Sequence, residues 1–341
     1  IDLFYDCSEL SSITVVGEGE NLKMVDGVLF NKDMTRLIWC SPEKSGSFSI
    51  PSTIQTIDLG CFYSREKLTS VTIPNTVTEI TDSAFSCCSS LETVVIPSSV
   101  VSISNNAFYE CSSLTAIEIP DSVTSIGEQA FFYCTSLRSI TIPGSVREIG
   151  DKAFCYCLHL TSVVLPNSLK AIGEGAFICC NELRSVTIPG GLEILGANVF
   201  AECDNLSEIK VAGNGVNFKV VDGVLFDKEI TRLVVCLRRK SGSYKIPNTV
   251  KTIDGYAFFN CKELTSMIIP NSITEIADHT FENCSGLETV TIPSSVASIG
   301  EFAFSNCESL TTLTIPDSVA SIGDCAFANC SRLGTLSLPK S

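Results

Sequence analysis

The sequence has 341 residues, of which 45% are hydrophobic and 18% charged, and its 38 acidic and 23 basic side chains give a net charge of −15. A chain this apolar can bury a large core, which excludes intrinsic disorder. The acidic balance argues against binding to nucleic acid or anionic lipid, both of which need Lys and Arg. With two histidines, His-based catalysis and His-rich metal sites are disfavoured. No apolar run approaches the roughly 18 residues of a membrane-spanning helix.

A repeat of 23 residues runs through the sequence, with the consensus L-T-S-V-T-I-P-x-S-V-x-x-I-G-x-x-A-F-x-x-C-x-x. Phe recurs three residues before the shared cysteine position, from Phe4 to Phe327, and Leu recurs three residues after it. Because one such unit cannot bury its own apolar face, stacked copies must supply the core for one another. The repeat therefore predicts a solenoid. Twelve of the thirteen prolines share one phase: Pro51, Pro74, Pro97, Pro120, Pro143, Pro166, Pro189, Pro247, Pro270, Pro293, Pro316 and Pro339.

In chain order, we expect one continuous solenoid over residues 1–341. A hairpin-bearing insert occupies 15–50, a run of seven coils 51–211, a second hairpin-bearing insert 212–246, and a second, truncated run of coils 247–341. Since the chain starts without Met and stops inside a repeat, we expect it to be a piece of a longer protein.

The two inserts are copies of each other, because Val25-Asp-Gly-Val-Leu-Phe returns 196 residues later as Val221-Asp-Gly-Val-Leu-Phe. In each, two β-rich stretches surround a short polar link, which predicts a β-hairpin. Asp26-Gly27 and Asp222-Gly223 are interpreted as turn residues, with calcium binding as the less favoured alternative.

Within a coil, Leu68, Val71 and Ile73 alternate with Ser70 and Thr72, which is typical of a half-buried strand. We expect these strands to pair in parallel along the concave side of a right-handed superhelix and to end at the phased proline, which cannot donate to a ladder.

A second short extended piece follows each proline, as at Val77 to Ile80. Ala-Phe-x-x-Cys fits one helical or 3₁₀ turn on the convex side, with Phe and Cys inward. Recurrent glycines are expected where the backbone needs a conformation open to Gly: Gly127, Gly150, Gly173, Gly300 and Gly323.

These residues resemble the BspA-like leucine-rich repeat family over nearly the whole chain, most clearly in the string Ile119-Pro-Asp-Ser-Val-Thr-Ser-Ile-Gly-Glu-Gln-Ala-Phe-Phe-Tyr-Cys134. The inserts resemble the D-G-V-L-F segment that interrupts such arrays. The resemblance implies a secreted or surface-displayed protein that binds host matrix or other cells through an extended surface. It identifies no binding residue. Cys61, Val199 and Thr280 replace the usual Ala, and Arg65 replaces the phased Cys, which puts local packing in doubt.

Eleven of the eighteen cysteines are in phase, from Cys7 to Cys330. One cysteine per coil predicts an inward column of free thiols, because free Cys is commonly buried. Disulfides between adjacent coils are the alternative, and the spacing fits zinc poorly. The off-phase Cys87, Cys155, Cys179 and Cys325 are expected near the convex side and exposed.

The remaining polar candidates are interpreted as solvated surface. This applies to His159 and His279, and no Ser-His-Asp grouping can be built from them. It applies also to the basic segment Arg238-Arg239-Lys240 at the tip of the second insert, for which a partner contact is the alternative. We expect no catalytic residues, no cofactor and no metal site.

The leading hypothesis is a non-enzymatic extracellular or cell-surface protein that binds a protein ligand on a host or neighbouring cell. The alternatives are a glycan-binding surface, for which aromatic platforms are missing from the strands, and a structural spacer. The candidate binding residues are the outward strand positions between two inward aliphatics: Thr72, Val95, Glu118, Thr141, Val164, Thr187, Ile268, Thr291 and Thr314.

Overall fold

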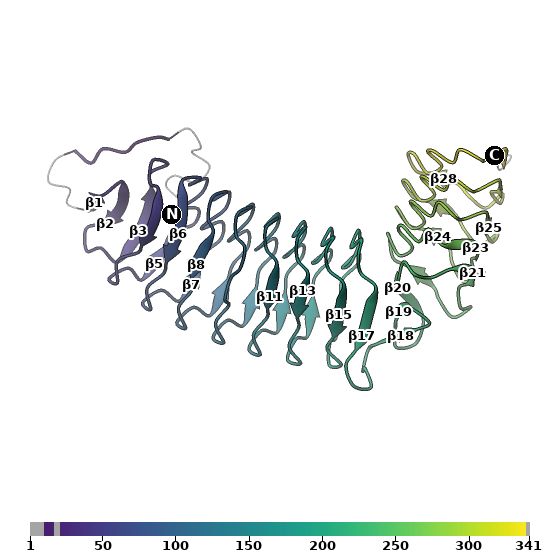
Figure 1. Ribbon diagram of the computed structural model, residues 1–341, viewed down its shortest axis with the longest axis horizontal. Coiled ribbons are helices and arrows are strands. Elements are labelled where there is room, and N and C mark those ends of the chain that lie inside the picture. The colour runs from purple at the N-terminus through teal and green to yellow at the C-terminus, as the bar shows by residue number, and fades with distance from the viewer. Residues whose placement is uncertain (1–9, 17–20, 339–341) are drawn as a thin grey trace. The chain divides into compact units, whose positions relative to one another are not determined.

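The computed structural model describes residues 10–16 and 21–338, which form β-strands and turns and contain no helix (Figure 1). Phe4, Cys7 and Pro339 of the repeat pattern lie outside the described residues. The chain divides into two compact units. Unit 1 contains the described residues of Ile1–Leu183 and Ile194–Val199, and unit 2 those of Arg184–Glu193 and Phe200–Ser341. Each is a β-solenoid of stacked coils.

The first strand of each coil builds a row of parallel strands, as the alternation of apolar and polar residues predicts. Neighbouring strands pair one repeat apart, so that Ser70 lies opposite Thr93. In unit 1 an isolated bridge from Ala116 to Ser139 continues the row where no strand forms. The unit 1 strands are β4 (Gly46–Ser49), β6 (Leu68–Thr72), β8 (Thr93–Val95), β11 (Ser139–Thr141) and β13 (Ser162–Val164).

Unit 2 has the same row of parallel strands, paired as β15-β17, β21-β23-β25 and β27-β29. Its members are β15 (Ser185–Ile188), β17 (Glu208–Val211), β21 (Gly242–Lys245), β23 (Leu264–Ile268), β25 (Thr289–Thr291), β27 (Thr312–Thr314) and β29 (Thr335–Ser337). The outward side chains of this row, in each unit, are called the strand face below.

A second row of two-residue strands follows the prolines, and each strand places one aliphatic residue inward. In unit 1 they pair in the order β7-β9-β10-β12-β14-β16, and in unit 2 as β24-β26-β28. They are β7 (Glu79–Ile80), β9 (Ser102–Ile103), β10 (Ser125–Ile126), β12 (Glu148–Ile149), β14 (Ala171–Ile172), β16 (Ile194–Leu195), β24 (Glu275–Ile276), β26 (Ser298–Ile299) and β28 (Ser321–Ile322).

Each insert contains an antiparallel meander of three strands, one more than the hairpin expected from the sequence. The first turn of the first insert is Asp26-Gly27, both with positive φ, which suits a two-residue hairpin. The third strand pairs in parallel with the next short strand and so joins the solenoid. The strands are β1 (Leu22–Val25), β2 (Val28–Asn31), β3 (Arg36–Cys40) and β5 (Thr56–Ile57), then β18 (Phe218–Val221), β19 (Val224–Asp227), β20 (Arg232–Cys236) and β22 (Thr252–Ile253).

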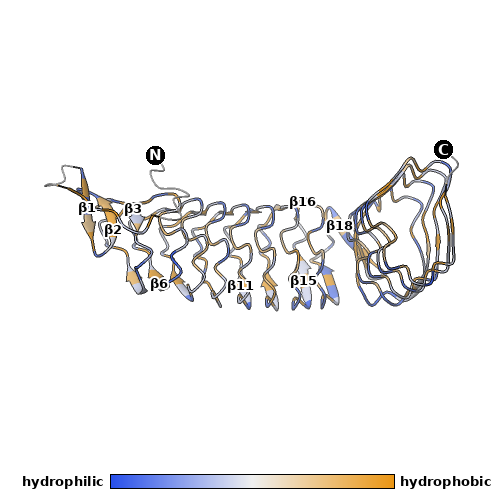
Figure 2. Cartoon of the chain, turned by 90° about the horizontal axis from the view of Figure 1, so that it is seen from above, coloured by the Kyte–Doolittle hydropathy of each residue, from blue (hydrophilic) through white to orange (hydrophobic). Residues whose placement is uncertain are grey.

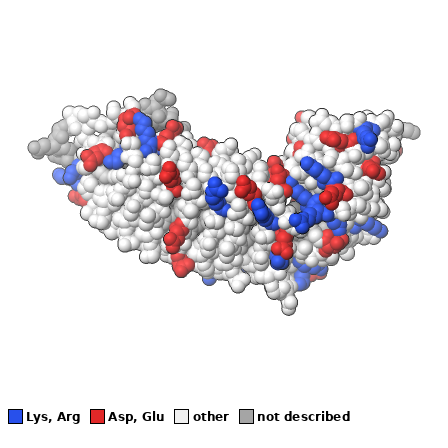
Figure 3. Space-filling model, in the orientation of Figure 1, with Lys and Arg blue, Asp and Glu red and all other residues white. Residues whose placement is uncertain are grey.

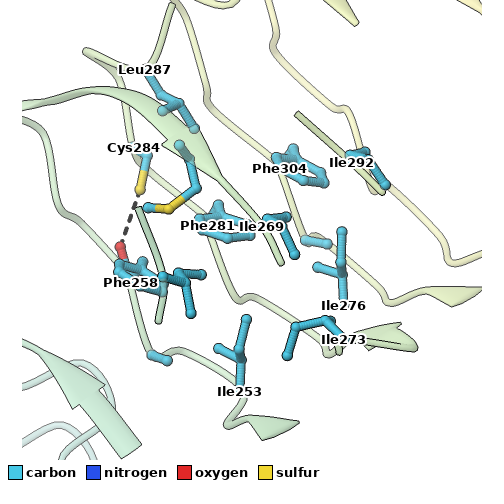
Figure 4. Close-up of a cluster of buried hydrophobic side chains, with 14 of the residues drawn as sticks. Ile253, Phe258, Ile269, Ile273, Ile276, Phe281, Cys284, Leu287, Ile292 and Phe304 are labelled. Carbon is cyan, nitrogen blue, oxygen red and sulfur yellow. Dashed lines mark hydrogen bonds between the residues drawn. The ribbon is translucent and has the colours of Figure 1, made fainter. Parts of the chain in front are cut away.

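Hydrophobic and hydrophilic stretches alternate along every coil (Figure 2), and the apolar residues stack into columns inside each unit. In unit 1 the rings of Phe108 and Phe131 lie 5.2 Å apart and nearly parallel. In unit 2 Phe258, Phe281 and Phe304 form the same column, with centroids 5.2 and 5.1 Å apart (Figure 4). Burying such a side chain contributes about 1.5–3 kcal/mol, so the columns supply much of the stability.

The recurrent glycines allow close approach of the coils, and our expectation of an unusual backbone conformation there was wrong. Gly127, Gly150 and Gly173 do not have positive φ. A Cβ on Gly150 would lie 2.6 Å from the backbone nitrogen of Glu128 in the preceding coil. Positive φ occurs two residues later instead, as at Lys152.

As expected from the sequence, the Ala-Phe-x-x-Cys segment is a short turn in every described coil, and it does not extend into a helix. A hydrogen bond from Cys134 N–H to Phe131 O closes the turn in one coil. The residue before the phased cysteine then has positive φ, 59° at Tyr133, and this interrupts any helix. Phe and Cys still point inward, as expected.

Candidate partner-binding surface

All nine strand-face residues identified from the sequence are exposed. The expected register is confirmed in β13 of unit 1, where Val164 is 57% exposed and the preceding Val163 is 8% exposed. Thr72, Val95, Glu118, Thr141 and Val164 belong to unit 1, and Thr187, Ile268, Thr291 and Thr314 belong to unit 2.

Hydroxyl groups dominate the strand face. A second outward column, two residues before the first, is also mainly Ser and Thr. Within it Thr93 donates to the Ser70 hydroxyl at 3.0 Å in unit 1, and Ser266 donates to Ser243 at 2.6 Å in unit 2. Glu118 is the one charged residue among the nine positions. Figure 3 shows mostly uncharged surface over β8, β11 and β13.

Three exposed aliphatic side chains interrupt the hydroxyl columns. Val95 and Val164 are 55% and 57% exposed in unit 1, and Ile268 is 41% exposed in unit 2. Their backbones are held by pairing with strands of adjacent coils. Each is a rigid apolar contact point. Val164 has the uncharged Thr141 and Thr187 one repeat away on either side, whereas Ile268 pairs with Lys245.

The basic tip of the second insert is not a solvated loop, contrary to our expectation. The guanidinium of Arg238 donates to the Asp204 carboxylate and lies 5.6 Å from the Phe259 ring centroid. Lys240 pairs with Asp222 and lies over the Tyr244 ring, with its side chain only 12% exposed. Arg239 remains exposed between them. Ion pairs within the protein thus neutralise two of the three positive charges of this segment.

The two histidines differ. His159 is a half-exposed surface residue, as expected, with Nδ1 2.7 Å from the Thr135 carbonyl. The same expectation for His279 was wrong, because its ring is stacked at 4.4 Å on Tyr256 and at 5.1 Å on Phe302. Its Nδ1 also lies 2.6 Å from Glu282 Oε2. His279 therefore belongs to an aromatic column between coils.

The phased cysteines form buried columns of free thiols, which confirms the favoured interpretation for the described residues. Most of these S–H groups donate to the carbonyl of the Phe in the preceding coil, as Cys111 does to Phe85 at 3.1 Å and Cys284 to Phe258 at 3.1 Å (Figure 4), whereas Cys261 donates to the Cys236 carbonyl. Burial raises the pKa of the Cys88 thiol to about 12 and that of Cys111 well above its ordinary value. These thiols are thus structural donors, poorly suited to nucleophilic chemistry.

The off-phase cysteines follow the expected exposure only in part. Cys325 is exposed and Cys87 is half-buried, but Cys155 and Cys179 are only 3% and 4% exposed. Cys155 takes the place that the bulky Phe132 has in the preceding coil, where ring contacts cover the turn.

One buried cation was missed by the sequence analysis. Arg65, which replaces a phased cysteine, is 6% exposed, and its Nε donates to the Cys40 carbonyl as a cysteine would. Its guanidinium lies 5.4 Å from the Trp39 ring. Burial lowers the pKa of Arg65. The second insert has Val235 and Cys261 at these two places, so the pair Trp39 and Arg65 was the available sequence signal.

Residues 10–16 and 21–338 lack two features of other protein classes. Within those ranges no group of three or more His, Cys, Asp or Glu side chains is placed to hold a metal ion. No helix long and apolar enough to cross a membrane occurs there either.

Stacked 23-residue coils with a parallel strand row and a buried thiol column define a leucine-rich-repeat β-solenoid. The chain belongs to the BspA type leucine rich repeat family, whose model matches in six copies over residues 39–157, 101–228 and 238–341. No curated protein matches the chain. The family is one of leucine-rich-repeat surface proteins, a class typically used for protein interaction and not for catalysis.

Solved structures agree with this assignment. A leucine rich cell surface protein from Faecalibacterium prausnitzii is 32% identical, with a TM-score of 0.80 over 95% of this chain and 96% of its own. A leucine-rich repeat protein from Bacteroides ovatus is 27% identical, with a TM-score of 0.59 over 96% and 89%. The pneumococcal vaccine antigen PcpA, at 22% identity and a TM-score of 0.67 over 92% and 80%, shares the fold.

Proposed function

We propose that this protein is a non-enzymatic, cell-surface or secreted adhesion protein that binds a protein ligand through its strand face. The ligand belongs to the host extracellular matrix or to a neighbouring cell. Family membership supports the interaction role, and the similar Faecalibacterium protein, described as a cell surface protein, supports the location.

The observation that carries the proposal is the set of exposed aliphatic side chains on rigid, uncharged strands. Val95 and Val164 each expose more than half of their surface. A partner that covers them gains apolar burial and loses few strongly hydrated charges. Because strand pairing already holds the backbone, little conformational entropy is lost on binding.

The proposal is tested by placing a charge on the unit 1 strand face, in β13. Val164→Asp should abolish binding to immobilised matrix proteins or intact host cells, while the free energy of unfolding changes by no more than about 0.5 kcal/mol, as for other surface substitutions. Val101→Asp is the matched control, since Val101 is 49% exposed but lies outside the strand face. It should bind normally.

A companion variant checks the register. Val163→Asp would bury an unpaired carboxylate and should unfold the neighbouring coils. Full binding by a folded Val164→Asp protein would exclude the part of the strand face around Val164. If Val95→Asp and Ile268→Asp also left binding intact, the strand row would be a structural spacer.

A further inference from the structure

Unit 2 carries an asparagine column on its turn edge that unit 1 lacks. The residue before the phased cysteine is Asn260, Asn283, Asn306 and Asn329 in four successive coils. In unit 1 the same position holds residues such as Cys87, Glu110, Tyr133 and Tyr156, also at positive φ. Asn tolerates this conformation well, but the side chains of unit 1 show that the backbone alone does not require it.

Three of the four asparagine side chains are joined to one another, while the Asn260 amide donates to Asp204 Oδ1 at 3.4 Å. Asn306 Nδ2 donates to Asn283 Oδ1 at 2.8 Å, and Asn329 Nδ2 donates to Asn306 Oδ1 at 2.8 Å. Each amide has two donor hydrogens and an oxygen with two lone pairs. The ladder uses one donor and one acceptor of Asn306, so a fixed donor and a fixed acceptor remain for another molecule.

The backbone beneath this ladder is also held firmly. Asn260 N–H donates to Glu282 O at 2.8 Å and Asn306 N–H donates to Ala328 O at 2.8 Å, so each coil is pinned to the next. The amide plane and the main chain are both preorganised, which lowers the entropy lost on binding.

The ladder borders an open polar groove of about 610 Å³. Its lining is hydrogen-bonding throughout: Asn260, Lys262, Asn283, Ser285, Asn306 and Glu308. Lys262 and Glu308 are exposed and opposite in charge, so the lining has no net charge. A groove without apolar pockets or net charge suits a ligand rich in hydroxyl groups.

We propose that this groove binds an extended, uncharged oligosaccharide, with about one sugar ring for each coil. Adjacent coils here repeat every 5.1 to 5.6 Å, measured between stacked rings, which is close to the length of one pyranose ring in an extended β-1,4-linked chain. An extended peptide rises only about 3.2–3.4 Å per residue, so its groups would not stay in phase with the ladder. Two neighbouring polar substituents of each ring, either two hydroxyls or a hydroxyl and an acetamido group, pair with the donor and acceptor of one amide.

The test uses the full chain and two probes, cellohexaose and chitohexaose, measured by titration calorimetry. At least one hexamer should saturate the protein and bind about tenfold more tightly than its dimer, because more coils are engaged. The variant Asn283→Gly/Asn306→Gly removes two amides while keeping a residue that accepts positive φ. It should lose about tenfold or more in affinity while the protein remains folded.

Asn106→Gly is the matched control, an asparagine at φ 54° in unit 1, and it should bind the hexamer as the parent does. Val164→Asp should also keep full oligosaccharide binding, which separates this groove from the strand face. Failure of both hexamers to bind at millimolar concentration would overturn the proposal. So would equal binding by Asn283→Gly/Asn306→Gly, or displacement of the sugar by a Gly-Ser peptide of matching length, which would identify a peptide groove.

Discussion

Adding one methyl group at Gly150 should force two coils of unit 1 apart. The new Cβ of Gly150→Ala would lie 2.6 Å from backbone atoms of Gly127 and Glu128. Carbon contacts are most favourable at about 3.5–4.0 Å, so the coils must separate by about 0.9 Å. The hydrogen bond from Gly150 N–H to Ile126 O, now 2.8 Å, would then reach about 3.7 Å and be lost. A lost bond costs about 0.5–1.5 kcal/mol and overpacking about 1–3 kcal/mol, so we expect about 2–4 kcal/mol of destabilisation.

The control lies six residues earlier in the same coil. A Cβ on Gly144 would have no heavy atom within 4 Å, and its φ is not positive. Gly144→Ala should therefore leave stability unchanged or raise it by about 0.4–1 kcal/mol, by restricting the unfolded chain. Urea unfolding followed by circular dichroism gives both values from the midpoint of the unit 1 transition. Equal effects at the two glycines would refute the close-approach explanation.

The thiol columns give two further predictions. Labelling of the native protein with a thiol reagent should modify Cys325 first and Cys87 more slowly, leaving Cys155 protected; rapid labelling of Cys155 would contradict its burial. Burial raises the folded-state pKa of thiols such as Cys134. The stability that each such thiol contributes is therefore fully present below the unfolded-state pKa of about 8.5. Above that pH, the free energy of unfolding falls by about 1.4 kcal/mol per thiol for each pH unit. Unfolding at pH 8 and pH 10 checks this, and Cys134→Ala should show a shallower slope.

The repeat period made the coil anatomy predictable from the sequence. Every coil presents equivalent positions to equivalent neighbours, so one alternation, such as Val163 inward and Val164 outward, sets the register of the whole row. The Phe and Cys columns follow for the same reason. Residue type alone was ambiguous for Gly150, since both positive φ and close approach select glycine, and only the distance between coils separates the two causes.

Contacts made by residues that depart from the consensus were not predictable. Arg238 is docked because Asp204 and Phe259 come from other parts of unit 2. The asparagine ladder was not predictable either, because four Asn residues in phase do not reveal how their amides are oriented. Such contacts arise where the sequence departs from its consensus, and there the repeat carries no information.

The pair formed by Trp39 and Arg65 offers a test of how an array absorbs a departure from its consensus. Trp39→Val should remove the ring that the Arg65 guanidinium contacts. Arg65→Cys should leave a cavity beside the indole of Trp39. Each substitution alone should therefore destabilise unit 1. The double variant recreates the pair that the second insert uses, Val235 and Cys261. It should recover part of the loss, giving a coupling of about 0.5–3 kcal/mol in a double-mutant cycle followed by urea unfolding. Additive losses would mean that Arg65 is held by the Cys40 carbonyl alone and that the two inserts are not interchangeable at this point.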